Sequence, residues 1–230
     1  MNAIEQWINE TFSNVGVLSS IKVTFQMAVC STVISALLGI PLGLLLEKHH
    51  FPGRRIAVRV NRTLMGVPPV VIGLLVYMLL MRRGPLGAFR WLFTIKGMVL
   101  AQTLIITPII CGMVYSYAVR TAPAIRSFAV TMGANPMQTN RLMLREMKNE
   151  IYFAILSGFG RSISEVGAVM LVGGNIKGNT RTMTTAISLL KSQGIFTEGV
   201  ALGLILLLMA FLLQCLADFF RKEEIPVEND

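Results

Sequence analysis

Two opposite charges stand inside an otherwise apolar stretch, and they offer more chemistry than any other pair in the chain. Arg161 and Glu165 are four residues apart in the run Gly-Phe-Gly-Arg-Ser-Ile-Ser-Glu-Val-Gly-Ala-Val-Met-Leu-Val-Gly-Gly-Asn, residues 158–175. On a helix this spacing places both side chains on one face, where they can pair. A charge at the centre of a membrane helix costs about 2.5–3.5 kcal/mol, so it is rarely accidental. Two interpretations stay open: a buried ion pair that fixes the helix against its neighbours, or an arginine that faces a path through the membrane.

The composition places these charges in a membrane protein. The chain has 230 residues, of which 53% are hydrophobic and 14% are charged, whereas soluble proteins carry about 25% charged residues. The net charge is +9, but the basic residues lie mostly in short segments between apolar runs. This distribution is typical of orientation in an anionic membrane, so we expect no nucleic-acid partner. Cys30, Cys111 and Cys215 lie in apolar stretches without paired spacing, which predicts buried thiols.

Five apolar segments are long enough to cross a bilayer. The first lies between Lys22 and Glu47, and the others cover residues 64–81, 97–119, 151–175 and 200–220. We therefore predict an all-α polytopic membrane protein with about five transmembrane helices and one domain over residues 1–230.

Prolines and glycines should shape these spans. Pro68 and Pro69 should break the start of the second span, and Pro108 should kink the third. Gly39 and Gly43 predict close contact between helices near the end of the first span.

Two further segments should be helical without spanning the membrane. The spacing of apolar residues in 1–16 predicts a short amphipathic helix at the interface or packed on the protein. Residues 180–190 predict a short helix that could re-enter the membrane.

Five crossings place the two termini on opposite sides. With residues 120–150 inside, the cytoplasmic segments contain 12 Arg and Lys residues and the outer segments contain 8, with Arg161 counted apart. Because basic residues favour the cytoplasmic side, this predicts an outer N-terminus and a cytoplasmic C-terminus.

Residues 120–150, here called the elbow, are polar and basic and lie between the third and fourth spans. Gly133 is the residue type that commonly forms a left-handed turn after a helix. Asn135 and Pro136 are favoured at the N-cap and first position of the next helix. We expect two short helices around a break, forming a rigid protrusion for another protein. An ordinary connecting loop is the alternative.

The elbow and the span after it resemble the permeases of binding-protein-dependent ABC importers. Aligned on Gly133, the third residue of that family's Glu-Ala-Ala motif is Ala129, while Ser127 and Phe128 replace the first two. Further segments resemble oxyanion permeases of the tungstate type in particular, and together they cover nearly the whole chain: residues 51–54, 67–73, 83–87, 158–176 and 178–186.

This resemblance implies a permease subunit that imports an oxyanion: tungstate, or as alternatives molybdate or sulfate. It implies a homodimer in the cell membrane of a prokaryote, in contact with lipid. It also implies two kinds of partner: an ABC ATPase subunit, which binds the ATP, and an extracytoplasmic substrate-binding protein.

The resemblance also assigns roles to residues of this chain. Coupling to the ATPase would involve Ala129, Gly133, Ala134, Asn135, Pro136, Arg141 and Arg145. Arg161 and Glu165 would line the translocation path or form a buried ion pair. The candidates for an outer gate are Gly173, Gly174, Asn175, Asn179 and Thr180.

The chain itself is expected to perform no chemistry and to hold neither a cofactor nor a metal. Residues 173–180 imitate the spacing of a phosphate-binding loop, but Asn179 stands where lysine is required. His49 and His50 lack further ligands nearby. The sequence has no H-E-x-x-H or G-x-S-x-G motif, which argues against a membrane-embedded enzyme. A channel or ATP-independent carrier is the other rival, but we find no convincing internal repeat of the kind that many carriers show.

Overall fold

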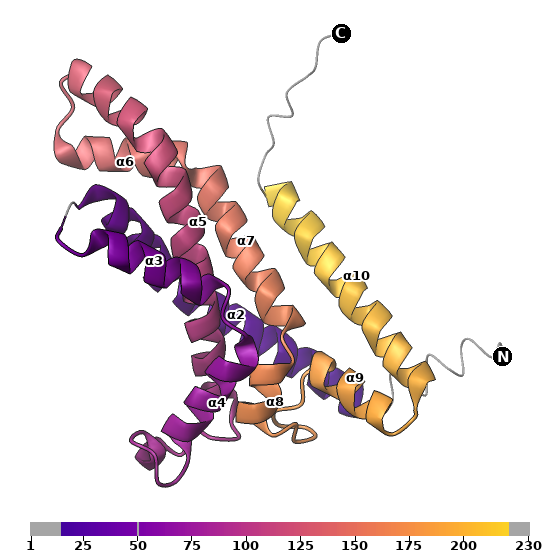
Figure 1. The fold of residues 1–230 in the computed structure, drawn as a ribbon. Coiled ribbons are helices and arrows are strands. Elements are labelled where there is room, and N and C mark those ends of the chain that lie inside the picture. Colours follow the sequence, from indigo (N-terminus) through magenta and orange to yellow (C-terminus); the bar gives the residue numbers. More distant parts are fainter. Residues whose placement is uncertain (1–14, 50, 221–230) are drawn as a thin grey trace.

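The computed structural model describes residues 15–49 and 51–220, and every regular element within them is helical. The helix predicted for residues 1–16 lies, except for its last two residues, outside this part, as does His50. In chain order the elements are α2 (Val15–Lys48), α3 (Arg54–Met65), α4 (Pro69–Leu80), the 3-10 turn η1 (Gly87–Phe89), α5 (Ile95–Thr131), α6 (Pro136–Glu146), α7 (Lys148–Ser164), α8 (Gly167–Gly173), α9 (Met183–Ser192) and α10 (Phe196–Phe220) (Figure 1).

Three helices in the described part are long and apolar enough to cross a membrane singly: α2, α5 and α10. Two bent pairs pass the same test together, α3 with α4 and α7 with α8, bent by 101° and 60°. The structure therefore has three such helices, or five spans if each bent pair forms one.

The second predicted span begins at a sharp break, as the two prolines indicate. Pro68 precedes α4 with φ −59° and ψ 124°, and Pro69 is the first residue of that helix. A proline has no N–H to donate and keeps the preceding residue out of the helical region. Before this break, residues 54–65 form a helix of their own, α3, which the predicted spans did not include.

The third predicted span and the first helix of the elbow are one helix, α5, contrary to the expectation of two. The reason is packing beyond residue 119: Ala122 and Ala129 are buried, and the cluster around α5 includes Met143 and Met147 of the elbow. A helix whose buried face continues is stabilised over its whole length.

The helix α5 is the centre of the molecule. Of its most apolar stretch 67% is buried inside the chain, against 28% for α2 and 11% for α10. The helix α2 approaches α5 closely at two glycines: a Cβ on Gly39 would lie 3.0 Å from the Thr107 carbonyl oxygen, and one on Gly43 would lie 2.7 Å from that of Cys111. The predicted close contact is confirmed.

The cysteine prediction is wrong for two of three residues. Cys111 on α5 is buried, but Cys30 on α2 and Cys215 on α10 are exposed. Apolar sequence in a membrane helix does not imply burial inside the protein, because lipid accepts an apolar face as readily as the core does.

Candidate functional site

The elbow turns at Gly133, which has a left-handed φ of +70°. Its N–H donates to the Val130 carbonyl at 3.0 Å, and the N–H of Ala134 donates to the Ala129 carbonyl at 2.9 Å. These two bonds form the Schellman motif, which satisfies carbonyls at the end of a helix. The predicted left-handed turn is confirmed.

The helix α6 begins with a complete capping box. The Asn135 side-chain oxygen accepts the Gln138 N–H at 2.8 Å, and the Gln138 side-chain oxygen accepts the Asn135 N–H at 2.8 Å. Pro136 occupies the first turn, so both predicted starting residues are confirmed. The sequence analysis did not predict the role of Gln138 in this capping box, although polar residues three apart are a sequence signature of the motif.

The elbow exposes large apolar side chains, and the four most exposed are here called the elbow surface. Phe128 is 60% exposed, Val130 74%, Met132 70% and Met137 81%. Arg141 and Arg145 on α6 are also exposed. Large exposed apolar patches rimmed by polar residues are typical of protein interaction sites.

Ala129 does not belong to the elbow surface. Its side chain is only 1% exposed, and its carbonyl accepts a bond within the turn. Ala129 packs inside the chain and shapes the elbow, so any part it has in coupling is indirect.

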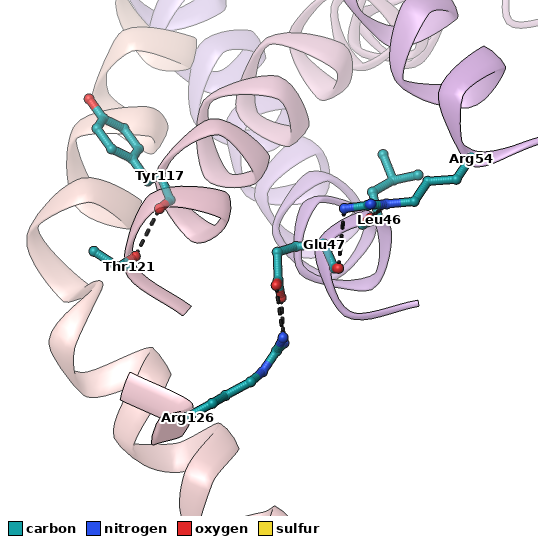
Figure 2. A network of polar contacts seen from close by, with 6 residues as sticks. All are labelled: Leu46, Glu47, Arg54, Tyr117, Thr121 and Arg126. Carbon is teal, nitrogen blue, oxygen red and sulfur yellow. Dashed lines mark hydrogen bonds and ion pairs between the residues drawn. The ribbon is translucent and has the colours of Figure 1, made fainter. Parts of the chain in front are cut away.

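An ion pair ties the elbow to the end of α2. Figure 2 shows Arg126 reaching Glu47, with Nη1 2.9 Å from Oε1 and Nη2 2.5 Å from Oε2. The Glu47 side chain is 7% exposed and that of Arg126 is 38% exposed. The partners are 79 residues apart, so no local sequence pattern indicates this contact.

Arg161 and Glu165 pair at the break between α7 and α8, with Nη2 3.1 Å from Oε2. The predicted pairing is confirmed, but Glu165 follows the last residue of α7 and does not lie within a continuous helix. Its other carboxylate oxygen accepts the Ala168 N–H at 3.3 Å, near the start of α8. The Glu165 side chain is 6% exposed and that of Arg161 is 40% exposed. The Glu165 carboxylate therefore links the end of α7 to the start of α8, while the Arg161 guanidinium remains partly exposed.

Glycines allow α8 to pack closely on α4. A Cβ on Gly73 would lie 2.6 Å from Ala168 Cα, and one on Gly167 would lie 2.5 Å from a methyl carbon of Val70. No larger residue fits at either position without displacing a neighbour, so the break is held against a second helix.

Two of the five gate candidates are engaged inside the chain. Thr180 and Gly173 are buried, and the Thr180 hydroxyl donates to the Gly173 carbonyl at 2.5 Å. These two residues hold the turn between α8 and α9.

The other three candidates lie nearer the surface of the same turn. Asn175 has a φ of +51°, and its side-chain oxygen accepts from Arg181 Nε at 3.2 Å. Gly174 and Asn179 are exposed.

Residues 39–223 match the family described as binding-protein-dependent transport system inner membrane component. The chain belongs to this family. It is 40% identical over 193 residues to the tungstate uptake system permease protein TupB of Peptoclostridium acidaminophilum, covering 84% of this chain and 85% of that protein. It is 37% identical over 211 residues to TupB of Campylobacter jejuni, covering 90% and 86%. It is 26% identical over 224 residues to the sulfate transport system permease protein CysW of Escherichia coli, covering 93% and 77%.

Family membership confirms the resemblance read from the sequence. The chain is a multi-pass permease subunit of an ABC transporter in the inner membrane and is not an enzyme. Membership also implies an ATPase partner and a substrate-binding protein partner.

Proposed function

We propose that this permease imports tungstate. The observation that carries the proposal is the 40% and 37% identity, over 84% and 90% of this chain, to two permeases named for tungstate uptake. The sulfate permease is more distant, at 26% identity. Molybdate and sulfate are the alternatives within the same class of tetrahedral oxyanions.

The elbow surface is the proposed contact with the ATPase. Its four apolar side chains are 60% to 81% exposed on either side of the turn at Gly133, and Arg141 and Arg145 are exposed further along α6. When ATP closes the ATPase subunits, the elbows are drawn together and the path opens to the opposite side. Arg161, 40% exposed beside the break, offsets the charge of the passing anion or fixes the break as a strut.

A second copy of the chain completes the path in this proposal. The helix α4 carries an outward apolar face of Val70, Val71, Leu74, Leu75 and Met78, each about half exposed, which a second copy would cover. Lipid would surround α10, whose apolar stretch is only 11% buried. The elbow would lie in the cytoplasm, with the N-terminus outside and the C-terminus inside.

Uptake by reconstituted vesicles tests the proposal. The permease, its ATPase and its binding protein are placed in liposomes, and tungstate uptake is measured with and without enclosed ATP. We expect ATP-dependent uptake that unlabelled molybdate or sulfate inhibits less than unlabelled tungstate does. Stronger inhibition by sulfate or molybdate would assign the transporter to that anion, and uptake without ATP would support the channel or carrier.

A further inference from the structure

Three elements meet at the last turn of α2. Arg126 of α5 binds both carboxylate oxygens of Glu47 (Figure 2). Arg54, at the start of α3, donates from Nε to the Leu46 carbonyl at 2.6 Å and from Nη2 to the Glu47 carbonyl at 3.3 Å. The Arg54 guanidinium also lies 5.8 Å from the ring centre of Tyr115 on α5. Because carbonyls at a helix end have no partner within the helix, these contacts fix the end of α2 to both neighbours.

The second arm of the elbow, α6, is separated from α2 by a groove of about 300 Å³. Leu44 and Leu45 line one side, Asn140 and Leu144 line the other, and the ion pair forms part of the wall. The helix α6 packs against α5 and α7 instead. The groove leaves α6 room to shift, while Arg126 keeps the elbow attached to α2.

The helix α2 leads from this junction to the rest of the candidate site. The Ser31 hydroxyl lies 2.9 Å from that of Ser162, the neighbour of Arg161 on α7. Nearer the start of α2, the Thr24 hydroxyl accepts the N–H of Met183, the first residue of α9, at 2.9 Å. Because α2 is fixed to α5 and α3 at its end and is bonded to α7 and α9, a displacement of its end would move the whole helix and reach α7 and α9.

We propose that Glu47 and Arg126 form a coupling latch, which transfers displacement of the elbow to α2 and through α2 to α7 and α9. The proposal rests on the proposed function, in which an ATPase moves the elbow. Both residues are positioning residues in this proposal, because they act through α2.

The geometry suits a latch. Two parallel charge-assisted bonds fix direction as well as distance, and the low exposure of Glu47 limits screening by salt. Removing Arg126 leaves a buried carboxylate without its counter-charge, so the last turn of α2 separates from the elbow.

The test measures tungstate taken up per ATP hydrolysed by the complete transporter in liposomes. For Arg126→Ala we expect ATP hydrolysis to persist while uptake per ATP falls about tenfold, a usual size for coupling between sites. Arg126→Lys keeps the charge and should retain most of the ratio. Arg120→Ala removes an exposed arginine from the same helix and serves as the matched control with an unchanged ratio.

An unchanged ratio for Arg126→Ala would overturn the latch, as would a parallel loss of hydrolysis and uptake by a complex that still assembles. If Arg126→Ala does not assemble, Glu47→Gln decides: a lower ratio than for Arg126→Lys supports the latch, and equal ratios contradict it.

Failure of the latch is distinguishable from failure of the proposed function. Wild-type protein without ATP-dependent tungstate uptake would refute the function and the latch together. Normal wild-type uptake with an unchanged ratio in Arg126→Ala would refute the latch alone.

Discussion

At Gly133 the backbone conformation, and not a contact, decides which residues are tolerated. Its φ is +70°, yet a Cβ there would meet nothing within 4 Å. The cost of a side chain at this position is therefore the left-handed conformation alone, about 1–2 kcal/mol.

We predict that Gly133→Ala lowers the free energy of unfolding by about 1 kcal/mol. Thermal unfolding of the purified protein in detergent measures the change. Gly160→Ala is the matched control, because Gly160 lies within α7, has no left-handed φ and also has open space around its Cβ. The control should be neutral or slightly stabilising, since alanine favours a helix over glycine. Equal destabilisation by both changes would contradict the argument.

The two interpretations of Arg161 also separate at the level of single residues. Arg161→Ala should abolish ATP-driven uptake under both, and near-normal uptake and assembly would refute both. The double variant Arg161→Ala with Glu165→Gln removes the unpaired buried charge as well. If Arg161 is a strut, uptake should recover in the double variant because no uncompensated carboxylate remains. If Arg161 faces the anion, uptake should stay lost, because the positive charge is still missing.

Local residue patterns predicted the turns well, but they did not predict which residues pair across distant helices. Gly133, Asn135 and Pro136 act on their own backbone, so their spacing is sufficient evidence. The pairing of Glu47 with Arg126 and of Ser31 with Ser162 spans 79 and 131 residues. These contacts depend on how helices are rotated against one another, and a single sequence does not contain that information directly.

At the scale of elements, the effect of a proline depends on whether its neighbours are also helix-breaking residues. Pro68 and Pro69 follow Gly66 and end α3, whereas Pro41 lies within α2 and Pro108 and Pro123 within α5. A single proline removes one backbone bond, and neighbouring groups can compensate for it. The break was therefore predictable from the double proline, but the length of α5 was not.

The elbow surface gives a prediction at this scale. Met137 is 81% exposed on α6, so Met137→Arg should leave the fold intact and introduce a charge into the proposed ATPase contact. We expect the variant permease to recover much less ATPase in a pull-down from detergent. Ser192→Arg, at an exposed position at the end of α9, is the control and should recover the wild-type amount. Equal recovery by both variants would refute docking through the elbow surface.

At the scale of the whole molecule, the helices have two opposite ends. The elbow and the end of α10 lie at one end, and the start of α2 lies at the other beside α9 (Figure 1). This arrangement requires α7 and α8 together to pass from one side to the other despite their 60° bend. The sequence predicted this crossing over residues 151–175, although Arg161 and Glu165 interrupt the apolar run.

Cysteine accessibility tests both the orientation and the crossing by α7 and α8. In a variant without the three native cysteines, Thr131→Cys marks the elbow and Ser192→Cys marks the end of α9, and both positions are exposed. A membrane-impermeant maleimide should label Ser192→Cys from outside the cell, and Thr131→Cys only in inverted vesicles. The excess of Arg and Lys in the elbow and in the other segments at its end supports this orientation. The opposite pattern would reverse the orientation, and labelling of both positions from one side would show that α7 and α8 do not form a span.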